Sequence, residues 1–324
     1  MRRAALWMGC LSLLCLSACT RLLFQPSRVL IQNPQQLGLS YQDVSFNSAD
    51  GTRLHGWFFP AQTRPVKGTF VQVHGNAENI STHFASLAWV TRHGYHLWTF
   101  DYRGYGQSAG QVSMDGVHED VRAAISEARV LSDAQGGGPL ILYGQSLGGA
   151  LLLYAVGTLD DRHAITVVVV DSAFSSYQAL AREKLAGSWV TFPLQALTPI
   201  LISDRYAPKR VLADISPLPL LVIHGERDGI VPWPHGGVIY KLAKAPKWFW
   251  KLPGVGHIQT MSAQHREYRQ ALLDFLDHLD PAGESSPSTE QPPIGPSRPH
   301  EAARLLTTLA SRPAAMTMED GDYR

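Results

Sequence analysis

An α/β fold with a mostly parallel sheet is the architecture that this sequence predicts. From residue 41 onward, short apolar runs typical of strands alternate with longer segments of helical pattern, and this alternation favours a sheet covered by helices on both faces. Val167 to Val170 are four consecutive valines, a run typical of a strand buried on both sides. The chain has 324 residues, of which 45% are hydrophobic and 17% charged, so it can form one large domain of about 240 to 250 residues with tails.

The expected strands begin with a hairpin. Residues 41–46 and 54–59 read as strands that flank Asp50-Gly51, a turn signature. Six more strands are expected at 69–73, 96–100, 140–143, 166–170, 218–223 and 247–252, with helical patterns between them at about 81–93, 115–133, 147–157, 234–245 and 261–279. These elements predict a sheet of about eight strands flanked by helices, in a domain that spans residues 41–280.

Two segments interrupt the alternation of strands and helices. Residues 172–215 predict a small helical cap over the carboxyl edge of the sheet, with apolar side chains that either wall an acyl pocket or pack the cap on the sheet: Phe174, Trp189, Phe192, Leu194, Leu197 and Ile200. Residues 281–324 are rich in Pro, Ser and Glu, a composition that predicts a disordered tail.

The first eighteen residues have the pattern of a signal peptide. Arg2 and Arg3 precede an apolar run over residues 4–18, which is shorter than the roughly 20 residues that a bilayer-spanning helix needs. The run ends in Leu16-Ser17-Ala18-Cys19, which resembles the lipobox of bacterial lipoproteins. The resemblance implies cleavage before Cys19 and acylation of that cysteine, and residues 19–40 then read as a linker from the membrane to the domain.

The same resemblance gives an expected location. Thr20 follows the cysteine, whereas inner-membrane lipoproteins often carry Asp there, so we expect a lipid-anchored protein of the bacterial envelope, at the outer membrane and facing the periplasm. Several acyl chains on one residue give stable membrane anchoring.

Composition argues against several other classes of function. The formal net charge is +1, and no basic stripe suggests a nucleic-acid partner. All three cysteines lie within the first nineteen residues, and the thirteen histidines form no HExxH motif. We therefore expect no metal site and no cofactor.

Ser146 is the candidate nucleophile. It lies in Gly144-Gln145-Ser146-Leu147-Gly148-Gly149, which follows an expected strand and opens an expected helix. A serine on such a sharp turn exposes its hydroxyl above the sheet, and the neighbouring glycines permit the crowded backbone. A bare G-x-S-x-G pattern is weak evidence, but this position between strand and helix strengthens it.

Asn76 and Leu147 are the candidate oxyanion-hole donors. His74-Gly75-Asn76 follows the strand expected at 69–73, and in this kind of site one backbone N–H comes from that loop and another from the residue after the nucleophile. Without Ser146, His74-Gly75 would read simply as a turn.

The other two candidate catalytic residues follow the last two expected strands. Asp228 lies after the strand at 218–223 and His257 lies in the Gly-rich loop after the strand at 247–252. The order Ser146, Asp228, His257 is the order that a nucleophile elbow of this type requires. Asp228 could instead only cap the following helix, and Asp171, at the end of the valine strand, is a rival for the acid. We favour Asp228, because the motif around it resembles the acid motif of α/β hydrolases.

Residues 41 to about 279 resemble the α/β-hydrolase superfamily, in its serine-aminopeptidase-like, depalmitoylase-like and monoacylglycerol-lipase-like branch. Relatives often have Asn after the catalytic His, where this chain has Ile258. The segments that carry the resemblance are His74-Gly75-Asn76-Ala77-Glu78-Asn79, Asp101-Tyr102-Arg103-Gly104-Tyr105-Gly106-Gln107-Ser108, Gly144–Gly149, His224–Pro232 and Gly256-His257.

The resemblance implies an α/β-hydrolase fold and a serine hydrolase that cleaves carboxylic ester or thioester bonds in a small-molecule or lipid substrate. Two alternatives stay open at this stage. One is a serine aminopeptidase, suggested by family analogy alone. The other is a catalytically silent binding protein on the same scaffold, against which the complete Ser146, Asp228, His257 set argues.

Overall fold

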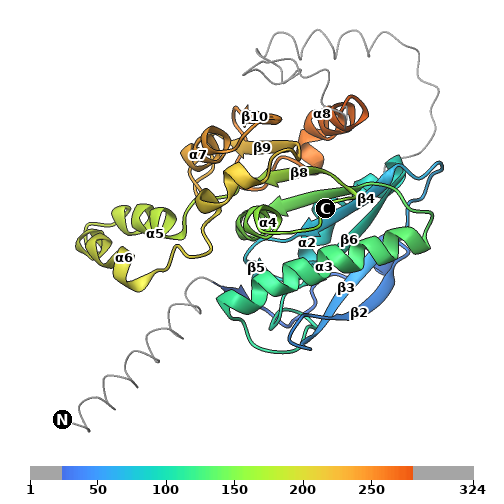
Figure 1. Ribbon diagram of the computed structural model, residues 1–324, viewed down its shortest axis with the longest axis horizontal. Coiled ribbons are helices and arrows are strands. Elements are labelled where there is room, and N and C mark those ends of the chain that lie inside the picture. Colours follow the sequence, from blue (N-terminus) through green and yellow to red (C-terminus); the bar gives the residue numbers. More distant parts are fainter. Residues whose placement is uncertain (1–23, 280–324) are drawn as a thin grey trace.

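The computed structural model describes residues 24–279, and these residues contain one eight-stranded sheet with the strand order β10-β9-β8-β7-β4-β6-β3-β2 (Figure 1). Neighbouring strands run parallel except at the pairs β2–β3 and β3–β6. The strands are β2 (Gln42–Asn47), β3 (Arg53–Phe59), β4 (Gly68–Val73), β6 (Tyr95–Asp101), β7 (Leu140–Gln145), β8 (Ile165–Asp171), β9 (Leu220–Gly225) and β10 (Lys247–Leu252). The expected fold class, a mostly parallel eight-stranded sheet, is confirmed.

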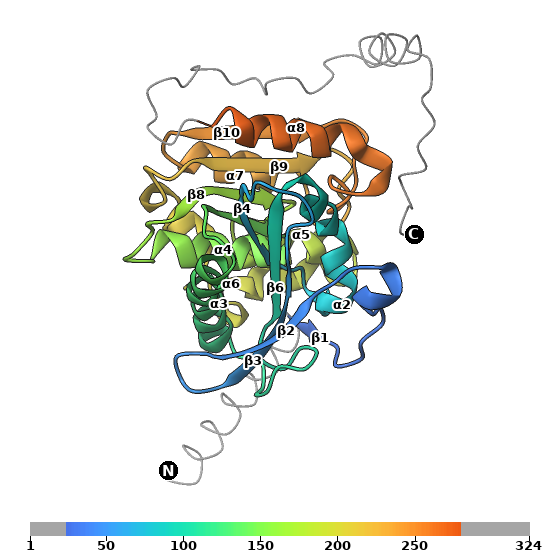
Figure 2. The same cartoon turned by 90° about the vertical axis from the view of Figure 1, so that its right-hand side faces the viewer.

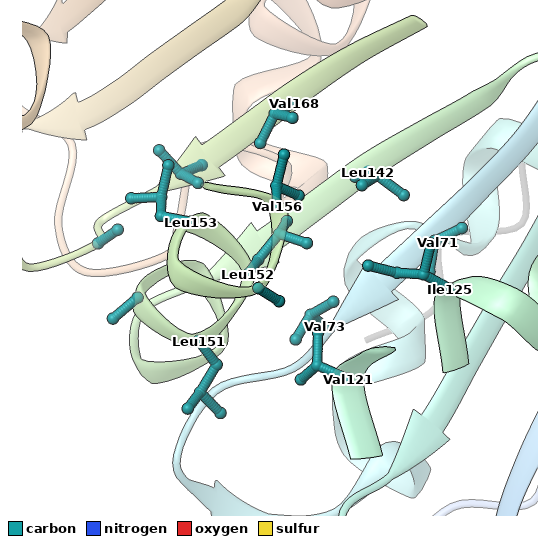
Figure 3. Packing of buried hydrophobic residues seen from close by; sticks show 14 of the residues in the cluster. Val71, Val73, Val121, Ile125, Leu142, Leu151, Leu152, Leu153, Val156 and Val168 are labelled. Atoms are coloured by element: carbon teal, nitrogen blue, oxygen red, sulfur yellow. The ribbon is translucent and has the colours of Figure 1, made fainter. Parts of the chain in front are cut away.

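Helices cover both faces of the sheet, as the alternation predicted (Figure 2). α3 (Met114–Ala134), α4 (Leu147–Gly157) and α7 (Pro234–Leu242) contribute to one apolar cluster, whereas α2 (Ile80–His83) and α8 (Arg266–Asp277) contribute to the other. Figure 3 shows how Leu152 and Val156 of α4 pack beside Val73, Leu142 and Val168 of the sheet. Because every residue of α4 except Tyr154 is buried, its first turn is held rigidly against the strands.

The helix expected at 81–93 is shorter than predicted. α2 ends at His83, and 3₁₀ turns at Phe84–Ser86 and Ala88–His93 complete the segment. The hydroxyl groups of Ser86 and Thr91 donate to the backbone carbonyls of His83 and Ala88, and such local hydrogen bonds compete with a regular helix. The apolar spacing nevertheless placed the segment correctly against the sheet, because Phe84 and Leu87 are fully buried.

Part of the expected linker, residues 24–40, belongs to the folded domain instead. β1 (Gln25–Pro26) pairs in parallel with β5 (Ala77–Glu78) in a small second sheet. Phe24 and Leu39 are only 2% and 4% exposed and lie in the two apolar clusters. Single apolar residues among prolines give no periodic signal, so this non-local packing was not visible in the sequence.

The cap is helical, as expected, but it does not bury its apolar side chains. α5 (Tyr177–Ala186), a 3₁₀ segment (Phe192–Leu197) and α6 (Thr198–Leu201) project from the sheet between β8 and β9 (Figure 1). Phe174 is buried, whereas Trp189 and Ile200 are 88% and 80% exposed. The expectation that these residues wall an acyl pocket or pack the cap on the sheet is therefore wrong for the outer part of the cap.

The expected signal peptide at 1–18, the anchor at Cys19 and the tail at 281–324 lie outside the described residues. Within residues 24–279, no helix combines the length and the apolar character needed to cross a bilayer.

The packing of the amino-terminal segment gives a stability prediction. Phe24→Ala should lower the free energy of unfolding by about 3 to 5 kcal/mol, because it removes a buried aromatic side chain and leaves a cavity. Leu30→Ala is the matched control, since Leu30 is 40% exposed and its loss should cost under about 1 kcal/mol. Guanidinium titration of both variants measures the difference; equal, small losses would mean that residues 24–40 do not contribute to the folded core.

Candidate active site

Ser146 lies at a strained turn between β7 and α4. Its backbone dihedrals are φ 52° and ψ −117°, a conformation that few non-glycine residues adopt and that persists only when the surroundings impose it. Two glycines allow the turn to form. A Cβ at Gly148 would lie 2.1 Å from the carbonyl oxygen of Val73, and one at Gly144 would lie 2.6 Å from the Cα of Gly149.

The structure brings Ser146, His257 and Asp228 together from the loops after β7, β10 and β9. His257 Nε2 lies 3.0 Å from Ser146 Oγ, and His257 Nδ1 lies 2.7 Å from Asp228 Oδ2. In this arrangement the Ser146 hydroxyl can donate to one ring nitrogen while the other ring nitrogen donates to the carboxylate. That is the geometry by which an imidazole removes the proton from a nucleophilic serine.

Asp228 is held as a carboxylate. Its Oδ1 accepts backbone N–H bonds from Ile230 and Val231 at 2.9 and 2.8 Å. Burial by itself raises the pKa of Asp228, but hydrogen bonding to His224 and His257 outweighs it and keeps the pKa well below its usual range. The side chain therefore closes its own loop and meets His257. It does not cap the helix that follows, α7 (Pro234–Leu242), whose cap residue is Trp233.

Asp171, the rival acid, contacts hydroxyl groups instead of an imidazole. Its carboxylate accepts hydrogen bonds from Tyr143 Oη at 3.1 Å and from Ser172 Oγ and Thr260 Oγ1 at 3.2 Å each. Burial is the main influence on this group and raises the pKa of Asp171. Its backbone carbonyl accepts the N–H of Ser146 at 2.9 Å. Asp171 thus connects the nucleophile turn to the loop that carries His257, through Thr260.

The backbone at Ile258, where relatives often have Asn, lies in a region that suits Asn better than Ile. Its φ is 49°, in the left-handed region, where Asn is enriched and a β-branched residue is a true outlier. The backbone N–H of Ile258 donates to Ser172 Oγ at 3.1 Å, and Ser172 itself has a φ of 58°. The turn after His257 is therefore strained and held from the end of β8.

The two expected oxyanion donors lie beside the nucleophile. Leu147 is the first residue of α4, where a helix leaves its N–H groups without intrahelical partners. Asn76 follows Gly75, at which a Cβ would lie 3.8 Å from Ser146 Cβ. The structure therefore places both loops next to Ser146.

The Asn76 loop is held in place by residues that the sequence patterns did not identify. Asn76 Oδ1 accepts hydrogen bonds from the Gln25 N–H at 2.9 Å and from Tyr105 Oη at 3.1 Å. Tyr102 Oη donates to the carbonyl oxygen of His74 at 2.6 Å. Both tyrosines belong to a segment that carried the family resemblance, so a local signal for them existed. Gln25, from the presumed linker, had no such signal.

A cavity in the described part of the chain lies away from the candidate catalytic residues. A cavity of about 240 Å³ between the turns at 84–93 and α8 is lined by Phe84, Trp89 and Leu273, among others, and contains none of the three candidate catalytic residues. Among residues 24–279 no group of three or more His, Cys, Asp or Glu side chains is placed to hold a metal ion.

Residues 64–216 match the family model of serine aminopeptidase, S33. The chain is also 38% identical to the uncharacterized protein YfhR of Escherichia coli strain K12, over 73% of this chain and 81% of that protein. It is 32% identical to the uncharacterized protein Rv2307c of Mycobacterium tuberculosis, over 79% of this chain and 86% of that one. The α/β hydrolase domain-containing protein WAV2 of Arabidopsis thaliana is 28% identical, over 76% and 82% of the two chains.

Among solved structures, the esterase Pf2001 of Pyrococcus furiosus superimposes with a TM-score of 0.63 at 20% sequence identity. The match covers 79% of this chain and 99% of that one. At this level of identity the likeness concerns the fold.

The two aspartates should respond differently to the same substitution. Asp228→Asn should lower kcat by about 10⁴-fold, because an amide favours the wrong imidazole tautomer. Asp171→Asn should keep kcat within about tenfold but lower the free energy of unfolding by about 1 to 3 kcal/mol, since it disturbs a buried set of hydrogen bonds.

Turnover of a p-nitrophenyl ester and guanidinium titration, measured on both variants, separate the two effects. A larger loss of kcat in the Asp171 variant would reverse the assignment of the acid.

Proposed function

The chain is a hydrolase of the α/β-hydrolase superfamily, and we propose that it cleaves carboxylic ester or thioester bonds through an acyl-enzyme on Ser146. One observation carries the proposal. His257 lies within hydrogen-bond distance of both Ser146 Oγ and Asp228 Oδ2, at 3.0 and 2.7 Å. These three residues supply a nucleophile, a base and a group that orients the base.

Acylation begins when His257 Nε2 accepts the hydroxyl proton of Ser146 as Oγ attacks the carbonyl carbon. The tetrahedral intermediate collapses, the bond to the alcohol or thiol breaks, and the leaving group takes the proton from His257. Water then attacks the acyl-enzyme by the same route, with His257 as base, and the carboxylic acid leaves. The ionised Asp228 stabilises the imidazolium that forms in each half of the reaction.

The backbone N–H groups of Asn76 and Leu147 are the proposed donors to the oxyanion. Each such donor typically stabilises the transition state by about 3 to 4 kcal/mol. The first turn of α4 adds the positive end of its dipole next to Ser146. The contacts from Gln25 and Tyr105 to Asn76 support this role, because they hold the loop in one place before substrate binds.

We also propose that the protein is anchored in the bacterial envelope by acylation of Cys19, at the outer membrane and facing the periplasm. Leu16-Ser17-Ala18-Cys19 after a short apolar run supports this proposal. The buried Phe24 then lies only five residues after the anchor.

Ser146→Ala should abolish ester hydrolysis and labelling by a fluorophosphonate probe, because both need the serine oxygen; the loss in kcat should be about 10⁶-fold. The variant should keep the unfolding midpoint of the wild type. Labelling of the variant at the wild-type rate would remove Ser146 from the mechanism.

Measurement of hydrolysis with two kinds of substrate distinguishes an esterase from a peptidase, the activity that the name of the matching family suggests. Wild-type protein should show a higher kcat/KM with p-nitrophenyl esters than with aminoacyl anilides. Faster anilide cleavage would favour a peptidase.

Cys19→Ala should block metabolic labelling with palmitate and leave the precursor uncleaved, because the acylated thiol and the cleavage signal are both lost. Cys15→Ala is the matched control and should be labelled and processed normally. Normal processing of the Cys19 variant would exclude the anchor.

A further inference from the structure

The outer part of the cap exposes seven large apolar side chains within residues 189–201. Single exposed apolar residues are ordinary on proteins, but many of them gathered in one short segment indicate an interaction site. Trp189 is 88% exposed and Ile200 is 80% exposed, and five neighbours are at least 42% exposed. The apolar cap face consists of Trp189, Val190, Phe192, Leu194, Leu197, Ile200 and Leu201.

We propose that the apolar cap face docks onto the surface of a lipid bilayer. The proposal rests on the membrane-anchored hydrolase proposed above and adds the surface through which that hydrolase meets lipid.

The backbone around these side chains suits an apolar interface. Thr191 Oγ1 donates to the carbonyl of Leu185 at 2.8 Å, and Gln195 Nε2 donates to the carbonyl of Phe192 at 3.1 Å. Thr198 Oγ1 donates to the carbonyl of Gln195 at 2.8 Å. These polar side chains donate hydrogen bonds to backbone carbonyls of the same segment. The apolar side chains can therefore enter the headgroup boundary of a bilayer without leaving these donors and carbonyls unpaired.

Two further apolar groups lie at the same carboxyl edge of the sheet as the candidate active site. Val29 and Ile31 are 68% and 57% exposed, and they are held to the loop after Asn76, because Asn79 Nδ2 donates to the carbonyl of Val29 and the Ile31 N–H donates to Ser81 Oγ. Ile230, 54% exposed, follows Asp228. Exposed apolar surface therefore borders the catalytic loops on more than one side.

The length of chain between anchor and domain favours a bilayer over other occupants. Residues 20–23 separate Cys19 from the buried Phe24, so the anchor lies within about 18 Å of Phe24 even if the chain is fully extended. Phe24 leads into β1, which pairs with β5 next to Asn76. In Figure 1, β5, the partner of β1, and α6 both lie to the left of β4 and β6, so β1 lies on the side of the domain that carries the cap.

The experiment uses the mature, lipidated chain in vesicles of phosphatidylethanolamine and phosphatidylglycerol. Cleavage before Cys19 removes Cys10 and Cys15, and acylation blocks Cys19, so an introduced cysteine is the free thiol. Ile200→Cys and Val130→Cys are each labelled with the environment-sensitive fluorophore NBD. Val130, on α3, is 62% exposed and serves as the matched control away from the cap.

Lipids with a nitroxide on the upper acyl chain should reduce NBD emission at position 200 by at least about twofold and leave position 130 nearly unchanged, because an interfacial side chain reaches about 5 to 10 Å into the headgroup boundary. Equal quenching at the two positions would overturn the proposal. So would a blue shift at position 200 that grows with protein concentration without vesicles, since the face would then bind a second copy.

Hydrolysis of water-soluble p-nitrophenyl butyrate by the same two labelled samples keeps the two proposals apart. If the samples hydrolyse the ester but position 200 is not quenched more than position 130, the proposed reaction is supported and the docking surface is excluded. If position 200 is selectively quenched but the ester is not hydrolysed, the docking surface is supported and the proposed reaction is contradicted.

Discussion

The strained backbone at Ser146 is the constraint on which the rest of the site depends. A serine with a φ of 52° needs a turn that cannot relax, and the surroundings prevent relaxation from three directions. Gly148 lies against the end of β4 with no space for a side chain, α4 is buried along almost all of its length, and the carbonyl of Asp171 holds the N–H of Ser146. The strain keeps Oγ above the sheet, where the loops after β9 and β10 can reach it. Fold stability thus maintains the geometry of the candidate site.

Local patterns were enough to predict the sheet and to identify Ser146, Asp228 and His257 as candidates. Each candidate follows an apolar run and lies among glycines or turn residues, because a parallel sheet places its functional loops at the carboxyl ends of strands. Position alone could not rank Asp228 over Asp171, since Asp171 ends β8 and Asp228 follows β9 closely; only the family-like motif around Asp228 favoured it. The three-dimensional contacts agree with that preference: Asp228 meets the imidazole, whereas Asp171 meets three hydroxyl groups.

The remaining differences come from contacts between distant parts of the chain. Residues 24–40 have the composition of a linker, yet Phe24 is buried and Gln25 donates to Asn76, 51 positions away. The cap has the composition of a buried element, yet Trp189 and Ile200 are mostly exposed. Composition reports how much apolar surface a segment carries but does not report which partner covers it. In one case the partner is the domain itself, and in the other case the proposed partner is lipid.

The parallel pairing of β1 with β5 also determines how the domain carries mechanical load. A force applied to Phe24 along the axis of β1 would shear the parallel pairing with β5 rather than unzip it. The first contacts to bear the load are the burial of Phe24 and the hydrogen bond from Gln25 to Asn76. The Asn76 loop lies next to Ser146, so tension on β1 is transmitted to the edge of the candidate active site as well as to the core that contains Phe24.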